Sequence, residues 1–214
     1  MTAPAVRLGP LLAERAVLVE RAQPAGRFAL RPADPAADLA VVHGWMNDPA
    51  VARFWQLDGP ADRTARHLAE QVDLDYSAAY LGLLDGVPMS YWEIYRADLD
   101  PLLDGRYPAK RNDAGVHLLI GPAHLRGRGL GTVLLREVAA RAFAADPYAT
   151  RVIAEPDVRN APSIAAFERA GFRRLADVEL VDKTAALMAK PRVPLPGPEA
   201  FRGTARPVNV RTHI

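Results

Sequence analysis

The most informative segment of this chain is Leu118-Leu-Ile-Gly-Pro-Ala-His-Leu-Arg-Gly-Arg-Gly-Leu-Gly-Thr132. An apolar strand runs into a loop that contains Gly127, Gly129 and Gly131, and an apolar helix is expected over 132–145. Glycine adopts positive φ angles and leaves space beside the backbone, so the loop amides can converge on one ligand. The positive end of the helix dipole also attracts anions. The pattern therefore predicts a pyrophosphate site.

This glycine loop does not fit the two commonest nucleotide-binding patterns. No Gly-Lys-Ser or Gly-Lys-Thr follows the glycines, which excludes a P-loop. A dinucleotide-binding fold carries its glycine loop after the first strand, with an acidic residue about 20 positions later. Here the loop follows several expected strands and two expected helices, so another class of site is indicated.

Hydrophobic periodicity and turn residues predict an α/β order for the whole chain. Asp85-Gly86 lies between two apolar runs and is a strong hairpin signal. Asn47-Asp48-Pro49 is expected to end the first helix, Asp62 to cap the second and Gly171 to end the last. The expected strands are 28–31, 79–84, 88–95, 115–120, 151–155, 173–180 and 185–190, and the expected helices are 38–46, 62–74, 132–145 and 161–170.

We expect one domain with two flanking segments. The 214 residues suffice for a single α/β core. Residues 1–26 form an N-terminal arm with a helical-looking run at 11–19, and residues 27–190 form the domain. Residues 191–214 are rich in Pro, Gly and Arg, which predicts a basic tail of uncertain order.

Composition excludes several classes of function. The chain has no cysteine, and its five histidines do not cluster at ligand spacing, so no metal is expected. The formal net charge of +2 is too small to indicate nucleic-acid binding. No apolar run approaches the roughly 18 residues of a membrane span, and charges interrupt any N-terminal signal sequence. We therefore expect a cytoplasmic protein.

Two motifs in this order resemble those of the GNAT (GCN5-related N-acetyltransferase) superfamily. The first is Arg126-Gly-Arg-Gly-Leu-Gly131, and the second is Arg159-Asn-Ala-Pro-Ser-Ile-Ala-Ala-Phe-Glu-Arg-Ala-Gly-Phe172. The resemblance implies an α/β fold with a central mixed, mostly antiparallel sheet, splayed between two central parallel strands and flanked by helices. It also implies an acyl-CoA co-substrate, acetyl-CoA or succinyl-CoA, and no metal.

The resemblance further implies which residues hold the coenzyme. Strand residues around Leu119 would bond the pantetheine arm, the 126–131 backbone would hold the pyrophosphate, and one face of the later helix would flank the thiol. The implied cofactor-binding residues are Leu118, Leu119, Ile120, Arg126, Gly127, Arg128, Gly129, Leu130, Gly131, Thr132, Asn160, Ser163 and Phe167.

Other features resemble the acyltransferases of siderophore biosynthesis. These features are Trp45-Met-Asn-Asp-Pro-Ala-Val51 with Phe54-Trp55, and Gly115-Val-His117 with Glu155-Pro-Asp-Val-Arg-Asn160. The branch includes enzymes that acylate lysine, hydroxylysine and N-hydroxylated diamines. The implied acceptor is a small-molecule amine or hydroxylamine, and the implied substrate-binding residues are Trp45, Asn47, Trp55 and Trp92.

His117 and Asp157 are the candidate catalytic residues. Acyl transfer to nitrogen must remove a proton from the acceptor and must stabilise negative charge on the carbonyl oxygen. We expect both side chains to face one cleft where two parallel strands part. Asp157 is then the general base or a group that orients the substrate, and His117 is the base or a donor to the substrate.

Two other functions remain open from the sequence. The chain could acetylate another small amine or an aminoglycoside, or it could bind acyl-CoA without catalysis and regulate a partner. The loop 97–113 mixes acidic and basic residues, so it does not favour a polycationic acceptor. We expect a monomer or a homodimer without nucleic-acid or membrane partners.

Overall fold

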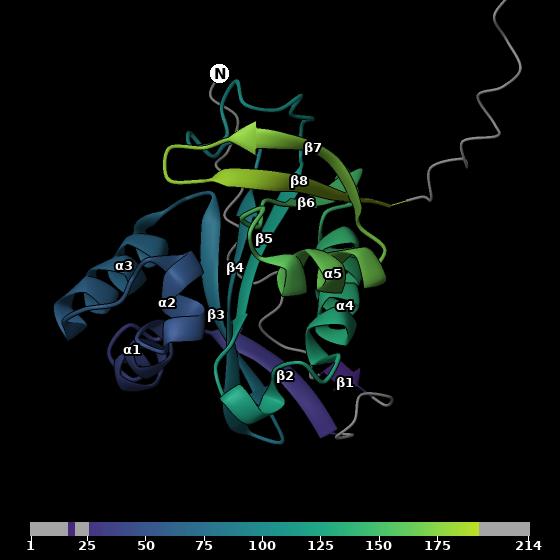
Figure 1. The fold of residues 1–214 in the computed structure, drawn as a ribbon. Coiled ribbons are helices and arrows are strands. Elements are labelled where there is room, and N and C mark those ends of the chain that lie inside the picture. Colours follow the sequence, from purple (N-terminus) through teal and green to yellow (C-terminus); the bar gives the residue numbers. More distant parts are fainter. Residues whose placement is uncertain (1–16, 20–25, 193–214) are drawn as a thin grey trace, which may run out of the picture.

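The computed structural model describes residues 17–19 and 26–192 and is built around one eight-stranded sheet. The strands follow the order β1-β2-β3-β4-β5-β6-β8-β7 across the sheet (Figure 1). Their bounds are β1 Val17–Val19, β2 Gly26–Pro32, β3 Ser77–Leu84, β4 Val87–Arg96, β5 Ala114–Ile120, β6 Arg151–Ala154, β7 Arg173–Glu179 and β8 Thr184–Pro191. The helices are α1 Leu39–Met46, α2 Pro49–Trp55, α3 Ala61–Asp73, η1 Ala123–Leu125 (a 3-10 turn), α4 Leu130–Ala145 and α5 Ala161–Arg169.

All neighbouring strands run antiparallel except β5 and β6. These two pair in parallel at Ala114 with Val152 and at Gly115 with Ile153, and then they part. The rest of β5 keeps its antiparallel pairing with β4. A mixed, mostly antiparallel sheet that splays between its central parallel strands confirms the expected fold class.

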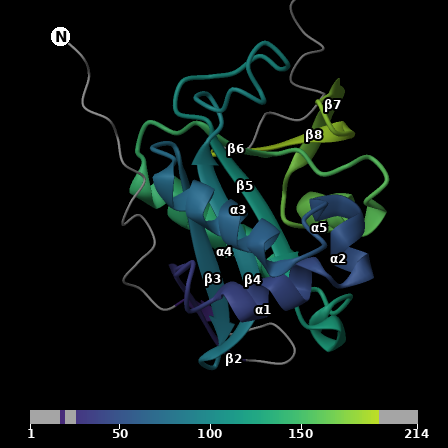
Figure 2. The same cartoon turned by 90° about the vertical axis from the view of Figure 1, so that its left-hand side faces the viewer.

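Helices cover both faces of this sheet (Figures 1 and 2). α1, α2 and α3 lie on one face, and α4 and α5 lie on the other. Successive side chains of β5 point to opposite faces. Leu119 packs with the α1–α3 cluster, whereas Leu118 and Ile120 pack against the α4–α5 cluster. β5 therefore contributes to both layers of the core.

Helix α2 was not predicted from the sequence. Asn47-Asp48-Pro49 ends α1 as expected, but it also begins a new helix. The Asp48 side chain accepts a hydrogen bond from the Ala50 amide, and proline at the first helical position loses no hydrogen bond. Val51 and Trp55, four residues apart, are the apolar signal for this short helix.

Two local expectations near the N-terminus were wrong. Residues 17–19 form β1 rather than a helix, with Val17 opposite Phe28 of β2. The β-branched Val17 and Val19 favour a strand when the edge of another strand is present. Residues 11–16 of the same run lie outside the described residues. Helix α3 begins at Ala61 after Pro60, so Asp62 lies in the first turn rather than at the cap.

Arg192 extends the described structure past the expected domain boundary at residue 190. Its guanidinium donates to the backbone oxygens of Phe143, Asp146 and Ala149 at distances of 2.8, 2.5 and 2.8 Å. These bonds occupy carbonyl groups at and just beyond the end of α4, which a helix leaves unpaired. The rest of the expected tail and most of the expected arm lie outside the described residues, so the three-part division stays a prediction.

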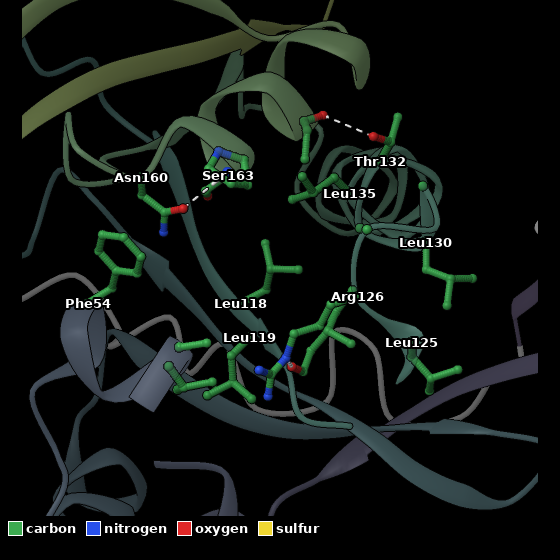
Figure 3. A pocket seen from close by; sticks show the side chains of 18 of the residues that line it. Phe54, Leu118, Leu119, Leu125, Arg126, Leu130, Thr132, Leu135, Asn160 and Ser163 are labelled. Carbon is green, nitrogen blue, oxygen red and sulfur yellow. Dashed lines mark hydrogen bonds between the residues drawn. The ribbon is translucent and has the colours of Figure 1, made fainter. Parts of the chain in front are cut away.

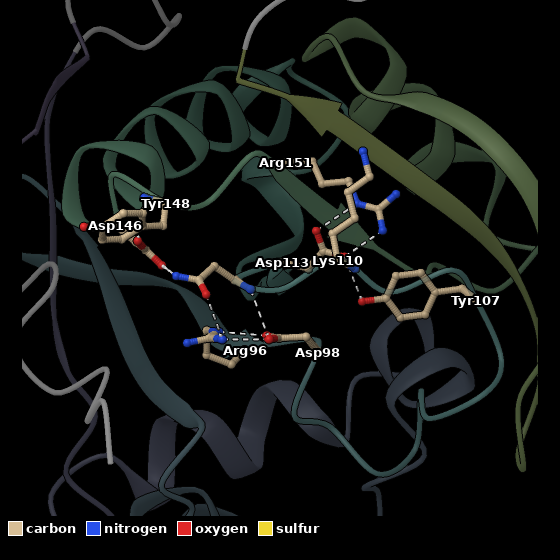
Figure 4. Close-up of polar contacts among 9 residues, drawn as sticks. Arg96, Asp98, Tyr107, Lys110, Asp113, Asp146, Tyr148 and Arg151 are labelled. Atoms are coloured by element: carbon tan, nitrogen blue, oxygen red, sulfur yellow. Dashed lines mark hydrogen bonds and ion pairs between the residues drawn. The ribbon is translucent and has the colours of Figure 1, made fainter. Parts of the chain in front are cut away.

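Two ion-paired carboxylates fix the loop between β4 and β5 (Figure 4). Arg151 of β6 binds Asp113 through two bonds of 2.8 and 2.7 Å, and Tyr107 and the Lys110 amide donate to the same carboxylate. Asp113 is fully buried. A second pair, Arg96 with Asp98, lies beside it. The loop is therefore anchored to the sheet at both of its ends.

We expect Asp113→Asn to destabilise the protein by about 3–5 kcal/mol, because it leaves the Arg151 guanidinium buried without its counter-charge. Asp177→Asn is the matched control, since its pair with Arg174 is exposed and such pairs contribute about 0–1 kcal/mol. Urea unfolding of both variants measures the difference. Equal losses would contradict the anchoring role of Asp113.

Candidate active site

The glycine loop takes the backbone shape that an anion site requires. Gly127 and Gly129 have φ angles of +71° and +80°, a region that disfavours other residues. Gly129 precedes the first residue of α4, and no side chain caps this helix. The first amides of α4 therefore have no partner within the helix and remain available to a bound anion.

A cavity of about 550 Å³ opens in front of this loop, where β5 leaves β6. Figure 3 shows strand residues Leu118 and Leu119 between α5 and α2, with Arg126 beside them. Most of the residues expected to bind the coenzyme line this cavity: Leu118, Leu119, Ile120, Arg126, Gly127, Gly129, Leu130, Gly131, Thr132, Asn160 and Ser163. Asn160 also caps α5 by accepting a hydrogen bond from the Ser163 amide at 3.2 Å.

Arg126 connects the glycine loop to α2. Its Nε donates to the Ile120 backbone oxygen at 2.7 Å, and a terminal nitrogen also bonds to the Gly121 oxygen. The same guanidinium forms an ion pair of 2.9 Å with Asp48, the N-cap of α2. The hydrogen bond from Arg126 lowers the pKa of Asp48 below its usual value. One side chain thus fixes the loop and the start of the helix that faces it.

Helix α2 supplies cavity residues that the sequence analysis did not identify. Ala50, Val51, Arg53 and Phe54 line the cavity together with Trp55, the one residue here that was expected at the substrate. The Arg53 guanidinium lies 4.6 Å from the centre of the Phe54 ring. Asp48-Pro49, a typical helix start, was the sequence feature that could have predicted α2. Because α2 was not predicted, these cavity residues were not predicted either.

The cavity is positively charged. Arg159 and Arg169, at the two ends of α5, line it together with Arg53 and Arg126. Arg126 and Arg159 are ion-paired with Asp48 and Asp157, so Arg53 and Arg169 contribute most of this charge. The same lining contains no Asp, Glu, His, Tyr or Lys. This charge suits an anionic ligand such as a phosphate ester, and groups that exchange protons near neutral pH lie elsewhere.

Two residues expected at the coenzyme do not line the cavity. Arg128 is exposed on the loop. Phe167 is buried in the core, and its ring centre lies 5.0 Å from that of Phe172. Trp92, expected at the substrate, is also fully buried in the core, where its Nε1 donates to the Ser90 hydroxyl at 2.8 Å. Core packing accounts for both aromatic residues.

Trp45 and Asn47, also expected at the substrate, make local structural contacts. The Trp45 indole lies against Gly121, where a Cβ atom would meet the ring at 2.0 Å. Asn47 bonds to His43 and accepts from the Gly59 amide at 2.9 Å. Neither residue is among those that line the cavity.

His117 lies beside this cavity, between two buried carboxylates. Its Nδ1 is 3.1 Å from Glu93 of β4, and its Nε2 is 2.8 Å from Glu155, which follows β6. The Tyr95 hydroxyl is 3.1 Å from the same Nε2 and also donates to Glu155. Glu93 and Glu155 are 8% and 3% exposed, whereas the His117 side chain is 33% exposed. The imidazole is therefore the accessible member of this group.

The two carboxylates keep His117 protonated. Burial disfavours the imidazolium, but the charges and hydrogen bonds of Glu155 and Glu93 outweigh it and raise the pKa of His117 to about 10. Burial likewise opposes ionisation of Glu93, yet its bonds to His117 and His67 lower its pKa to about 2. His117 also lowers the pKa of Glu155 against the effect of burial. At neutral pH the group therefore contains an imidazolium between two carboxylates.

Gly115 makes room for the contact between Tyr95 and Glu155. Tyr95 and Gly115 are directly opposite each other on β4 and β5. A Cβ atom at position 115 would lie 2.2 Å from the Tyr95 ring, so the ring crosses β5 over the glycine. The Tyr95 hydroxyl then reaches Glu155, which directly follows the end of β6.

Asp157 is held by a neighbour rather than by His117. Its carboxylate binds Arg159 through Nε at 2.9 Å and a terminal nitrogen at 2.6 Å, and it accepts from the Arg159 amide at 2.7 Å. The hydrogen bond from Arg159 lowers the pKa of Asp157. The hydrogen bonds and ion pairs in the described part of the chain join Glu155, not Asp157, to His117. Glu155 lies in the motif quoted for Asp157, so the segment was found but not the residue.

The family of the chain follows from its sequence. Residues 34–180 match the acetyltransferase (GNAT) domain family, and the chain therefore belongs to the GNAT acyltransferases, enzymes that use acyl-CoA. It is similar to the lysine N-acyltransferase MbtK of Mycobacterium sp. (strain MCS), with 37% identity over 80% of this chain and 70% of that protein. It is also similar to the N(6)-hydroxylysine O-acetyltransferase of Escherichia coli, with 30% identity over 77% of this chain and 52% of that protein.

Solved structures agree with this family and fold. An uncharacterised protein from Bacillus halodurans aligns with a TM-score of 0.78 and 33% identity over 84% of this chain and 91% of its own. The aminoglycoside acetyltransferase AAC(6')-Ib in complex with coenzyme A aligns with a TM-score of 0.69 and 27% identity over 77% of this chain and 95% of its own. The expected GNAT family and acyl-CoA co-substrate are confirmed at this level.

Residues 17–19 and 26–192 lack two further kinds of feature. None of the helices there has the length and apolar character needed to cross a membrane. In the same ranges, no group of three or more His, Cys, Asp or Glu side chains is arranged to hold a metal ion.

We expect Gly129→Val to weaken CoA binding at least 10-fold, because the added side chain enters the anion site in front of α4. No atom lies within 4 Å of a Cβ at this position, so space in the free protein is not the obstacle. Gly86→Val is a close control, with a φ of +81° and equally open space in the β3–β4 hairpin. Calorimetry measures affinity, and a loss shared by both variants would point to general backbone strain.

We expect the ion pairs of His117 to be lost at alkaline pH, so that the stability of the folded protein decreases there. A pKa raised from 6.5 to about 10 stabilises the folded state fully below pH 6.5, and this stabilisation is lost as the pH rises towards 10. The midpoint of thermal unfolding should therefore fall between pH 7 and 10 more steeply in the wild type than in His117→Gln. His124→Gln, in an exposed turn, should keep the wild-type slope. Parallel slopes in wild type and His117→Gln would contradict the raised pKa.

Proposed function

We propose that this protein transfers an acetyl or succinyl group from acyl-CoA to an N-hydroxylated amine in hydroxamate siderophore biosynthesis. The acceptor is a hydroxydiamine, hydroxyornithine or hydroxylysine. The observation that carries the proposal is His117, accessible between two buried carboxylates and packed against Trp55, which lines the cationic cavity. Relatives named for lysine and hydroxylysine acylation support this class of acceptor. Acyl-CoA is available in the cytoplasm, where we place the reaction.

The cavity accommodates the coenzyme along its length in this proposal. The free amides at the start of α4 and the Arg126 region hold the pyrophosphate. Strand residues Leu118 to Ile120 are free of β6 and offer backbone groups to the pantetheine arm. Arg53 and Arg169 supply further positive charge for phosphate groups. The thioester supplies an activated acyl carbon, and the protein has to orient the acceptor nitrogen towards it.

His117 acts in this proposal as a donor and not as the first base. Its raised pKa keeps it protonated at neutral pH, so it cannot accept a proton before the reaction begins. It can stabilise negative charge on the acyl oxygen or bind the oxygen of the acceptor. Glu155, in place of Asp157, is the acidic partner that takes up the proton, because it bonds to His117 and its Oε2 has no hydrogen-bond partner within residues 17–19 and 26–192.

An N-hydroxylated acceptor fits these weakly basic carboxylates. Such an amine is much less basic than an alkylamine and is mostly neutral at pH 7, so it needs no prior deprotonation. The C–N bond forms, the C–S bond breaks, and the nitrogen becomes acidic as it gains positive charge. A carboxylate of lowered pKa can accept that proton, and positioning supplies much of the rate.

An aminoglycoside is the second candidate acceptor. The alignment with an aminoglycoside acetyltransferase at 27% identity and the pair of carboxylates beside His117 favour it. A polycation, however, needs several uncompensated carboxylates. Here His117 neutralises part of that charge, and four arginines, two of them ion-paired, line the adjoining cavity. The charge distribution therefore favours the smaller acceptor.

A thiol-release assay at pH 7 tests this function. We expect kcat/KM to be at least 10-fold higher for an N-hydroxylated diamine or amino acid than for the matching plain amine, because only the former is mostly neutral. Acetyl-CoA and succinyl-CoA are compared for each acceptor. Glu155→Gln should lower kcat by about 10²–10⁴-fold without loss of CoA affinity. An aminoglycoside that outperforms every hydroxylamine would reassign the enzyme to the second candidate.

A further inference from the structure

The loop between β4 and β5 (residues 97–113) contains four aspartates that differ in their partners. Asp98 and Asp113 each bind an arginine (Figure 4). Asp104 is exposed to water. Asp100 is half-buried, yet within residues 17–19 and 26–192 no Lys, Arg or His side chain forms an ion pair with it. Its carboxylate has therefore lost part of its water without gaining a counter-charge there.

The order of elements places this loop and the coenzyme cavity at opposite ends of β5. The strand begins at Ala114, directly after the loop, and Leu118 to Ile120 line the cavity at its other end. His117 lies between these two ends. In the proposed reaction, on which this inference rests, acyl-CoA occupies the cavity and its acyl group reaches His117 from there. The acceptor then approaches His117 from the side of the loop.

A tight turn connects Asp100 to the residues around His117. The Leu103 amide donates to the Asp100 backbone oxygen at 3.0 Å, and the Leu102 amide donates to Asp100 Oδ1 at 2.9 Å. Leu103 is 2% exposed and belongs to the same apolar cluster as Tyr95. The Tyr95 hydroxyl lies 3.1 Å from His117 Nε2. The turn is thus packed into the layer that supports His117.

The loop is also braced against the neighbouring hairpin. Arg106 donates to the backbone oxygen of Glu179, the last residue of β7, at 2.7 Å. The ion pair of Asp113 with Arg151 holds the end of the loop to β6. A group on an anchored loop needs little ordering when a ligand binds, and this favours affinity.

The charges around His117 act on Asp100. Burial raises the pKa of Asp100, and the hydrogen bond from the Leu102 amide offsets part of this effect. The charges of Glu155 and Glu93 raise the same pKa further, whereas His117 lowers it. A half-buried carboxylate near two other carboxylates is unfavourable in its ionised form. A cation bound beside Asp100 offsets both the burial and the repulsion.

We propose that Asp100 binds the second, positively charged amino group of the acceptor. A hydroxydiamine, hydroxyornithine and hydroxylysine each carry one such group besides the hydroxylated nitrogen. The hydroxylated nitrogen is mostly neutral and is directed to His117, while the ammonium group is directed to Asp100. This pairing orients the acceptor, so an alkyl hydroxylamine without a second amino group is a poorer substrate.

Asp100→Asn removes the charge and keeps the turn, because the asparagine side-chain oxygen can still accept from the Leu102 amide. With N-hydroxydiaminopentane we expect kcat/KM to fall by about 10-fold to 100-fold, mainly through a higher KM for the acceptor. With N-pentylhydroxylamine, which has the same chain but no second amino group, kcat/KM should not change. Asp104→Asn is the matched control on the same loop and should leave both values unchanged.

An equal loss for both acceptors in Asp100→Asn would show that Asp100 only supports the loop, and an unchanged value for the diamine would also overturn the proposal. A binding measurement keeps this test separate from the proposed reaction. In calorimetry with CoA in place of acyl-CoA, wild type and Asp104→Asn should bind N-hydroxydiaminopentane about 10-fold more tightly than N-pentylhydroxylamine, and Asp100→Asn should lose this preference. A preference that wild type lacks, or that Asp100→Asn keeps, would refute the role of Asp100 even if neither compound were acylated.

Discussion

The parting of β5 from β6 is the constraint on which the rest of the site depends. The two strands share only the pairs Ala114 with Val152 and Gly115 with Ile153, because they diverge from there on. Divergence frees the later backbone of β5 and opens the cavity between α2 and α5. It also allows Glu155, which follows β6, to bond to His117 of β5. A fully paired parallel ladder would bury these groups and provide no space for a coenzyme.

Helix α2 is positioned by charge as well as by packing. Asp48 caps the helix and binds Arg126, and Arg126 in turn holds the backbone that precedes the glycine loop. At the other end of α2, the Trp55 ring lies 6.3 Å from the imidazole of His117. A short helix of low intrinsic stability thus links the glycine loop to His117.

Sequence patterns predicted the structural features that are determined by residues close together in the chain. The glycine loop, the hairpin at Asp85-Gly86 and the helix end at Gly171 follow from backbone preferences that a short segment reveals. The partner of His117 was different. Glu155 and Asp157 are two residues apart in one loop, and only the tertiary path decides that one meets His117 and the other meets Arg159. The large aromatic residues were equally ambiguous, since Trp55 lines the cavity and Trp92 fills the core.

The crossing of Tyr95 over Gly115 links two positions in evolution. A side chain at position 115 would overlap the Tyr95 ring, so neither residue can change freely while the other is kept. Lineages that keep the tyrosine should retain glycine, and a lineage that loses the tyrosine is released from that restriction. Covariation between positions 95 and 115 across homologues would then show which lineages kept the buried bond to Glu155. It would also show which lineages stabilise this carboxylate through another partner.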